Sequence, residues 1–243
     1  MALEWMADGL RLSLFSSENM KVTQSDWTRI TGKEELEAEH RARGRYAISG
    51  AFLEGQLSLS VVGSRVDCTL GPRPAAEPEG YVPSLGKWTE VSREFIGATE
   101  GWLSTLSIPI IRIAFGAGLL AAQPDLQQAY VSLLSMLRSV DGDPARMRDF
   151  MFRVNWPQNS MSINGLTLNR LTTWTVVQVQ WLLFDTGANA LTKDTSASPF
   201  VRLEIDHNTD GEWTQPFDPG RLVAIYRELF NLAVENAERG ELP

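Results

Sequence analysis

The fold is decided by residues 45–70, which read RYAISGAFLEGQLSLSVVGSRVDCTL. Apolar and polar residues alternate through most of this stretch, and a period of two is typical of strands that bury one face. Gly55 and Gly63 fall between the alternating runs, where tight hairpin turns favour glycine. The stretch therefore predicts a three-stranded antiparallel meander that ends near Gly71, before the breaker-rich linker at 72–83.

Helical periodicity follows the meander. Apolar residues spaced three, four and seven apart predict an amphipathic helix that is capped by Ser84 and buries Trp88 and Trp102. Residues 108–117 are almost continuously apolar, as in a central strand covered on both faces. A second amphipathic helix is predicted after Pro124, because proline is favoured in the first turn of a helix.

The last third of the chain repeats the order of strands followed by a helix. Strands are predicted at 150–156, 166–184 and 200–207, and a final helix is predicted after Asp218. Residues 185–198 are rich in Gly, Asn, Ser and Thr, which predicts an exposed loop.

These patterns predict an α+β protein with antiparallel sheets, each packed by amphipathic helices, in two similar lobes. We place an N-terminal sheet-plus-helix lobe at residues 1–122. The second lobe, at residues 123–243, contains a helix, a sheet and the terminal helix. Alternating leucines at 10–14 indicate a further strand in the first lobe.

Composition excludes several classes of function. The 243 residues carry a net charge of −8, and this acidic balance disfavours nucleic acids and anionic membrane surfaces as partners. The single cysteine, Cys68, and the two histidines, His40 and His207, cannot supply an intramolecular disulfide or a zinc site rich in Cys and His. We expect a cytoplasmic protein with no membrane span and no cofactor.

Four short motifs in order along the chain resemble a known family. They are FLEGQL at 52–57, the tryptophan-bearing helix at 88–102, IIRIAFG at 110–116 and LEID at 203–206. Together they resemble a sporadically distributed, uncharacterised bacterial family of about this length, over residues 45–241. The resemblance implies a bacterial cytoplasmic α+β protein with no catalytic residues to transfer. The sporadic distribution of the family associates it with antiviral and other defence genes.

The most site-like segment is the predicted strand that ends near residue 207. Arg202, Glu204 and Asp206 share one face of this strand, and its two carboxylates could hold Mg²⁺ with Asp210 reaching in from the turn. This arrangement gives one alternative function, a divalent-metal-dependent hydrolase or nuclease. The structural interpretation, a row of ion pairs on a sheet face, is favoured because charged strand faces are common.

Three further features of the sequence have structural interpretations. Arg112 lies among apolar neighbours, and we expect a buried ion pair with Glu204 or Asp206 across the sheet. Cys68 falls on the inward face of its strand and is expected in the core. The basic cluster at 40–45 is interpreted as a solvated face rather than a phosphate site.

Three tryptophans are candidates for a protein interface. Trp27, Trp156 and Trp213 lie at predicted element ends or beside polar residues, and exposed aromatics mark interfaces. The leading hypothesis is therefore a non-enzymatic protein-binding or regulatory component, whose acidic surface suits a basic partner. A peptide-binding adaptor or chaperone that captures an extended peptide at a sheet edge is the other alternative. A further alternative is a homodimer formed by sheet extension through residues 166–184.

Overall fold

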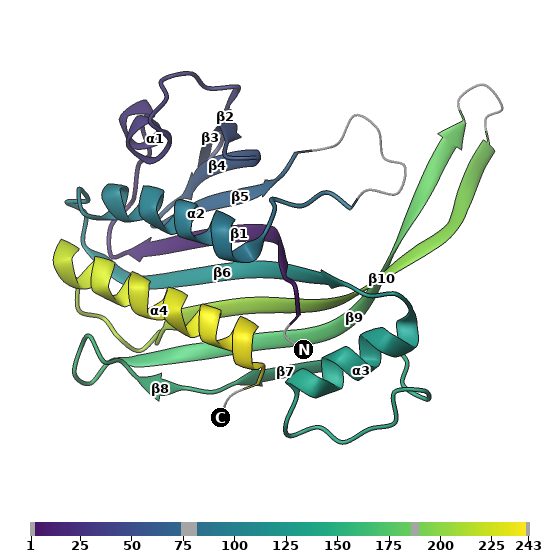
Figure 1. Ribbon diagram of the computed structural model, residues 1–243. Helices are drawn as coiled ribbons and strands as arrows, with labels where there is room; N and C mark the ends of the chain where they lie inside the picture. The colour runs from purple at the N-terminus through teal and green to yellow at the C-terminus, as the bar shows by residue number, and fades with distance from the viewer. Residues whose placement is uncertain (1–2, 74–81, 186–189, 242–243) are drawn as a thin grey trace.

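The computed structural model describes residues 3–73, 82–185 and 190–241, and for residues 181–185 and 190–197 it describes the backbone alone. A ten-stranded antiparallel sheet forms the centre of the molecule (Figure 1). Its strands are β1 (Met6–Ser16), β2 (Ala38–Ala42), β3 (Arg45–Phe52), β4 (Gly55–Val62), β5 (Arg65–Pro72), β6 (Ile110–Ala122), β7 (Met151–Asn155), β8 (Gln158–Asn159), β9 (Thr167–Asp185) and β10 (Ala190–Thr209). The strand order is β2-β3-β4-β5-β1-β6-β10-β9-β7, and β8 pairs with β9.

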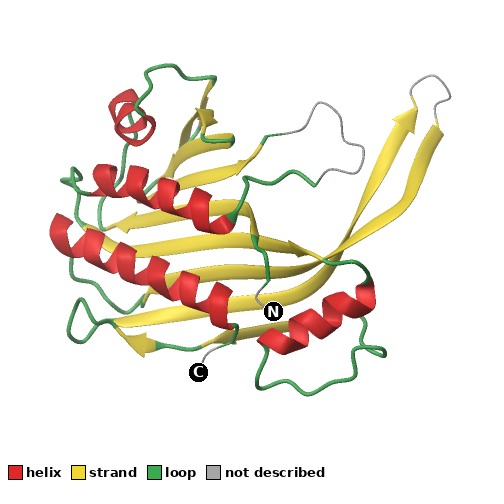
Figure 2. Ribbon diagram, in the orientation of Figure 1, coloured by secondary structure: helices red, strands yellow, loops and turns green. Residues whose placement is uncertain are grey.

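The helices gather on one face of this sheet (Figure 2). They are α1 (Gln24–Thr31), α2 (Trp88–Leu103), α3 (Leu126–Met136) and α4 (Pro219–Arg239). Helix α2 contacts β1, α4 contacts β6 and β10, and α3 contacts β9 and β10, while α1 packs on α2 and β3. No helix among the described residues covers the opposite face, which we call the open face. No described helix is both long and apolar enough to cross a membrane.

The predicted meander is confirmed as β3, β4 and β5. The glycine of the second turn, Gly63, has the expected positive φ of 57°. The first turn differs, because Leu53 takes the positive φ instead of Gly55. Gly55 is required for another reason: a Cβ there would collide with the Leu85 side chain and the Gly71 carbonyl.

The predicted helices are present, with one shifted start. Helix α2 begins at Trp88 with Lys87 at its N-cap, and not after Ser84. The preceding residues stay extended because Leu85 donates its N–H to the Ala7 carbonyl. The starts of α3 and α4 follow Asp125 and Asp218, whose side chains accept hydrogen bonds from helix backbone N–H groups.

The prediction of a loop at 185–198 is wrong for residues 190–198, which belong to β10. Residues 186–189 of this predicted loop lie outside the described residues, and so do residues 74–81 of the predicted linker. Strands β9 and β10 pair continuously except for a register shift between Lys193 and Ala197. Figure 1 shows the two strands continuing beyond the sheet as a two-stranded arm. Pairing with β9 prevails over the weak strand propensity of the polar residues.

The α+β class holds, with strands from both predicted lobes in one hydrogen-bonded sheet. Strand β6 connects them, because it pairs with β1 on one side and with β10 on the other. The division of the chain at residue 122 stays a prediction.

The main core lies between the sheet and helices α2 and α4. Trp88, Phe115, Tyr226 and Phe230 form an aromatic cluster there with ring centroids about 6 Å apart. The Tyr226 hydroxyl lies 2.9 Å from the Thr99 hydroxyl, and burial raises the pKa of Tyr226 well above its usual range. This packing on one face leaves the polar residues of the central strands on the other.

Candidate binding site on the open sheet face

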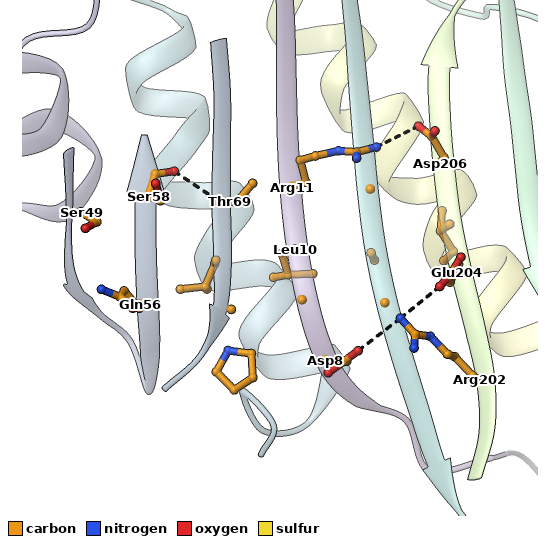
Figure 3. Close-up of a pocket in the computed structure, with 18 residues that line it drawn as sticks. Asp8, Leu10, Arg11, Ser49, Gln56, Ser58, Thr69, Arg202, Glu204 and Asp206 are labelled. Atoms are coloured by element: carbon orange, nitrogen blue, oxygen red, sulfur yellow. Dashed lines mark hydrogen bonds and ion pairs between the residues drawn. The ribbon is translucent and has the colours of Figure 1, made fainter. Parts of the chain in front are cut away.

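The open face is hollowed over its central strands. The groove has a volume of about 740 Å³ and is lined by residues from β1, β3, β4, β5, β6 and β10 (Figure 3). Charged side chains from β1 and β10 occupy one half, and small polar side chains from β3, β4 and β5 occupy the other. The groove therefore joins strands that lie far apart in the sequence.

Strand alternation sorts β10 between the two faces. Leu203 and Ile205 are buried on the helix side, whereas Arg202, Glu204 and Asp206 line the groove. The shared face that the sequence predicts for these three residues is thus the open face.

Two ion-pair contacts cross β6 to connect β1 with β10. Arg11 Nη2 lies 3.3 Å from Asp206 Oδ1, and Arg202 Nη2 lies 3.6 Å from Asp8 Oδ2. Arg202 Nη2 also lies 3.0 Å from Glu204 Oε1. We call these five residues the charged cluster; Figure 3 shows them on either side of β6. Their side chains are 31 to 53% exposed, so each pair contributes at most about 1 kcal/mol.

Two glycines of β6 lie beneath this crossing, and Gly116 leaves room for the Arg11 side chain. Gly116 is the register partner of Asp206, and Gly118 is the partner of Glu204. A Cβ on Gly116 would lie 3.2 Å from Arg11 Nη2, so the guanidinium occupies the space that a side chain would fill. Glycine inside a strand marks such a close approach.

The neutral half of the groove offers hydrogen-bonding groups on uncharged polar side chains. Ser49, Gln56, Ser58 and Thr69 line it, and the Thr69 hydroxyl donates to the Ser58 carbonyl over 3.5 Å. The short side chains of Ser49, Ser58 and Thr69 let a partner approach the strands closely. The groove thus pairs a charged wall with a neutral polar floor.

Arg112 also lies on the open face, but without the expected ion pair. Its Nη2 donates to Asn208 Oδ1 over 2.9 Å, and its guanidinium lies 5.2 Å from the Phe15 ring centroid. The expected partners, Glu204 and Asp206, pair with Arg202 and Arg11 instead. The register explains the difference, because Asp206 faces Gly116, four residues beyond Arg112 on β6.

A row of asparagines continues from Arg112 towards the β7 edge. Asn169 Nδ2 donates to Asn208 Oδ1 over 3.2 Å, and Asn155 Nδ2 donates to Asn169 Oδ1 over 2.9 Å. At the other end, Arg65 lies 5.1 Å from the Phe15 ring, which therefore sits between two guanidinium groups. This row fixes polar groups across several strands of the open face.

The predicted metal ligands are not gathered around a common point. Glu204 and Asp206 contact different arginines, and Asp210 Oδ1 accepts a hydrogen bond from the Glu212 backbone N–H in the turn after β10. Within residues 3–73, 82–185 and 190–241, no group of three or more His, Cys, Asp or Glu side chains is placed to hold a metal ion. The arrangement corresponds to the ion-pair interpretation of this strand.

The three candidate interface tryptophans have different environments. Trp27 is fully buried, and its Nε1 donates to the Glu35 carbonyl over 3.1 Å, so its prediction as an exposed contact is wrong. The ring packs against Gly50, where a Cβ would lie 3.0 Å from it. Trp213 is half-buried and stacks on Phe217 with ring centroids 5.9 Å apart. Trp156 is also half-buried.

Of the single cysteine and the two histidines, Cys68 and His207 lie in the core. Cys68 is fully buried as expected, and burial raises the pKa of its thiol. His207 is buried under α4, and burial lowers its pKa to about 4. His40 is exposed on β2. The core location of Cys68 and His207 keeps both side chains away from solvent on the open face.

The sequence did not point to Asp8, Arg11 or the asparagine row. Arg11 lies between Leu10 and Leu12 in an alternating strand, which indicates the side of the sheet but not the partner. Gly116 and Gly118 interrupt an otherwise apolar strand, and glycine inside a strand indicates that another group approaches the backbone closely.

Comparison with protein-family models and with curated proteins finds no match to this chain. The resemblance to an uncharacterised bacterial family stays a prediction.

Proposed function

We propose that this protein is a non-enzymatic binding or regulatory component that holds a partner protein on the open face. One observation carries the proposal: the described helices pack on one face of the sheet, while the other face presents a groove lined by charged and polar side chains. Ion pairs connect the side chains of the charged cluster before a partner arrives, which lowers the entropy cost of binding.

Charge favours a basic partner. The charged cluster contains three carboxylates and two guanidinium groups, and the chain as a whole carries a net charge of −8. This field attracts a basic protein surface and repels the phosphates of nucleic acids. Recognition at the groove would therefore combine charge attraction with hydrogen bonds to the neutral floor.

We further propose that the protein binds its partner in the bacterial cytoplasm, as part of a defence system. The support is the resemblance of residues 45–241 to the bacterial family, together with a single cysteine that needs no oxidising compartment. The half-buried Trp156 and Trp213 stay candidates for contacts with the same partner.

The test begins with recovery of the partner from cells that express the chain, followed by calorimetric titration of the purified pair. Glu204→Lys reverses a charge that is exposed in the groove, and we expect affinity for the partner to fall about tenfold. The matched control is Glu90→Lys, the same change at an exposed position of α2 on the other side of the sheet. Equal affinities of Glu204→Lys and the unaltered protein would refute binding at the groove.

A further inference from the structure

A second hollow lies at the β2 end of the sheet. It is formed by residues 19–24 and the β2–β3 hairpin, has a volume of about 790 Å³, and we call it the edge groove. Met20, Val22 and Val61, all less than 9% exposed, provide apolar surface, and the half-buried Tyr46 adds an aromatic ring. The edge groove is thus suited to apolar side chains.

Its rim is basic on an otherwise acidic chain. Lys21, Arg41 and Arg45 line it together with a single carboxylate, that of Glu39. Arg41 is held in place, because its Nη2 lies 2.7 Å from Glu39 Oε1 and its guanidinium lies 5.2 Å from the Tyr46 ring centroid. Lys21 and Arg45 form no ion pair within the described part of the chain. This local excess of positive charge favours an anionic occupant.

Strand β2 adds backbone groups beside the edge groove. It is the terminal strand of the sheet and pairs with β3 alone among the described strands. A two-residue turn joins β2 to β3, and Ala42 is paired with Arg45 across it. Because the pair that closes such a turn is hydrogen-bonded and bonded pairs alternate along the ladder, Glu39 and Arg41 direct their N–H and C=O groups away from β3. The same two residues line the edge groove with their side chains.

An extended peptide matches all three features. Unpaired edge groups bind another strand, and pockets beside the edge select alternate side chains of that strand. A nucleic acid, although also anionic, would leave the backbone groups of β2 without partners, because it has no strand to pair with them. A second copy joined by its β7 edge is disfavoured, because β7 carries the exposed Arg153 and would bring like charges together.

We infer that β2 and the edge groove bind an extended acidic segment of a partner protein by strand addition. The backbone of the segment pairs with Glu39 and Arg41. Its apolar side chains on the helix side enter the edge groove, and its carboxylates meet Lys21 and Arg45. This site accounts for the basic cluster at 40–45 and lies apart from the charged cluster of the open face.

The test uses a short fluorescein-labelled peptide of alternating glutamate and valine, with fluorescence anisotropy as the measurement. Two control peptides share its length: one has lysine in place of glutamate, and the other is N-methylated along one edge. We expect the acidic peptide to bind, and each control to bind at least about tenfold more weakly. N-methylation removes backbone donors without changing charge, so it separates strand addition from simple electrostatic attraction.

Protein variants locate the site. The double variant Lys21→Glu, Arg45→Glu should lower affinity for the acidic peptide at least about tenfold, whereas Arg153→Glu on the other edge should not change it. All three substitutions are at exposed positions. Glu204→Lys, in the charged cluster, should also leave peptide binding unchanged, so failure here is distinguishable from failure of the open-face proposal.

Several results would overturn the inference. They are absence of binding by the acidic peptide, equal binding of either control peptide, unchanged affinity of the double variant, and displacement of the peptide by single-stranded DNA. The comparison of the three peptides on the unaltered protein tests strand addition even where the double variant does not fold.

Discussion

The buried His207 should make the stability of the protein depend on pH. Its ring lies between β10 and α4, with Nδ1 3.3 Å from the Leu229 carbonyl oxygen. Burial lowers its pKa from 6.5 to about 4; the positive charge of Arg170 acts in the same direction, and hydrogen bonds with Leu229 and Asn236 oppose it. The folded protein therefore keeps this histidine neutral at a pH where the unfolded chain protonates it.

The sign and size of the effect follow from proton linkage. Between pH 6.5 and about pH 4 the unfolded state binds the extra proton, so the contribution of His207 to stability is complete above pH 6.5 and is lost as pH falls towards 4. Between pH 7 and pH 5 this loss amounts to about 2 kcal/mol of unfolding free energy.

Urea denaturation at the two pH values measures this loss. Carboxylates also titrate near pH 5, so His207→Leu serves as the reference, because leucine keeps an apolar side chain at the buried position. We expect the unaltered protein to lose about 2 kcal/mol more than the variant between pH 7 and pH 5. An equal loss in both proteins would refute the argument. A smaller loss in the unaltered protein than in the variant would show that folding raises the pKa of His207.

Three other substitutions or reactions test the packing. Trp27→Ala should lower the unfolding free energy by about 3 to 5 kcal/mol in urea denaturation, because the ring is fully buried; a loss below about 1 kcal/mol would contradict the core position. Gly240→Ala should lower it by about 2 kcal/mol or more, since Gly240 has a φ of 80° and a Cβ there would collide with the Met136 carbonyl; an unchanged melting temperature would contradict this contact. Cys68 should react with a soluble thiol reagent only after denaturation, because it is fully buried; rapid labelling of the folded protein would refute its place in the core.

Local patterns predicted the elements well where one face of each element is buried. The alternation through residues 45–70 gives β3, β4 and β5, and the helical spacing gives α2 and α4, because burial imposes the period on the sequence. The start of α2 was missed because backbone pairing between Leu85 and Ala7 competes with the helix.

The pairing of distant strands could not be predicted in the same way. A period of two shows which residues share a face, but it does not identify the neighbouring strand, so the position of β1 between β5 and β6 was not foreseen. The partners of the charged residues depend on that order. Arg11 reaches Asp206 only because β6 lies between their strands and carries Gly116 at the crossing point.

The local pattern also could not predict which single residues near the ends of elements are buried. Trp27 lies in a short helix among polar residues, which suggested exposure. It is buried because α1 packs on α2 and β3 and because Gly50 leaves room for the ring.

Carboxyl footprinting with a water-soluble carbodiimide tests the central claim, binding of a partner on the open face, most directly. Glu204 in the groove and Glu90 on α2 are both exposed in the free protein, so both should be modified without the partner. We predict that the bound partner protects Glu204 and leaves Glu90 as reactive as before. Protection of Glu90 with continued modification of Glu204 would place the partner on the helix side and contradict binding on the open face.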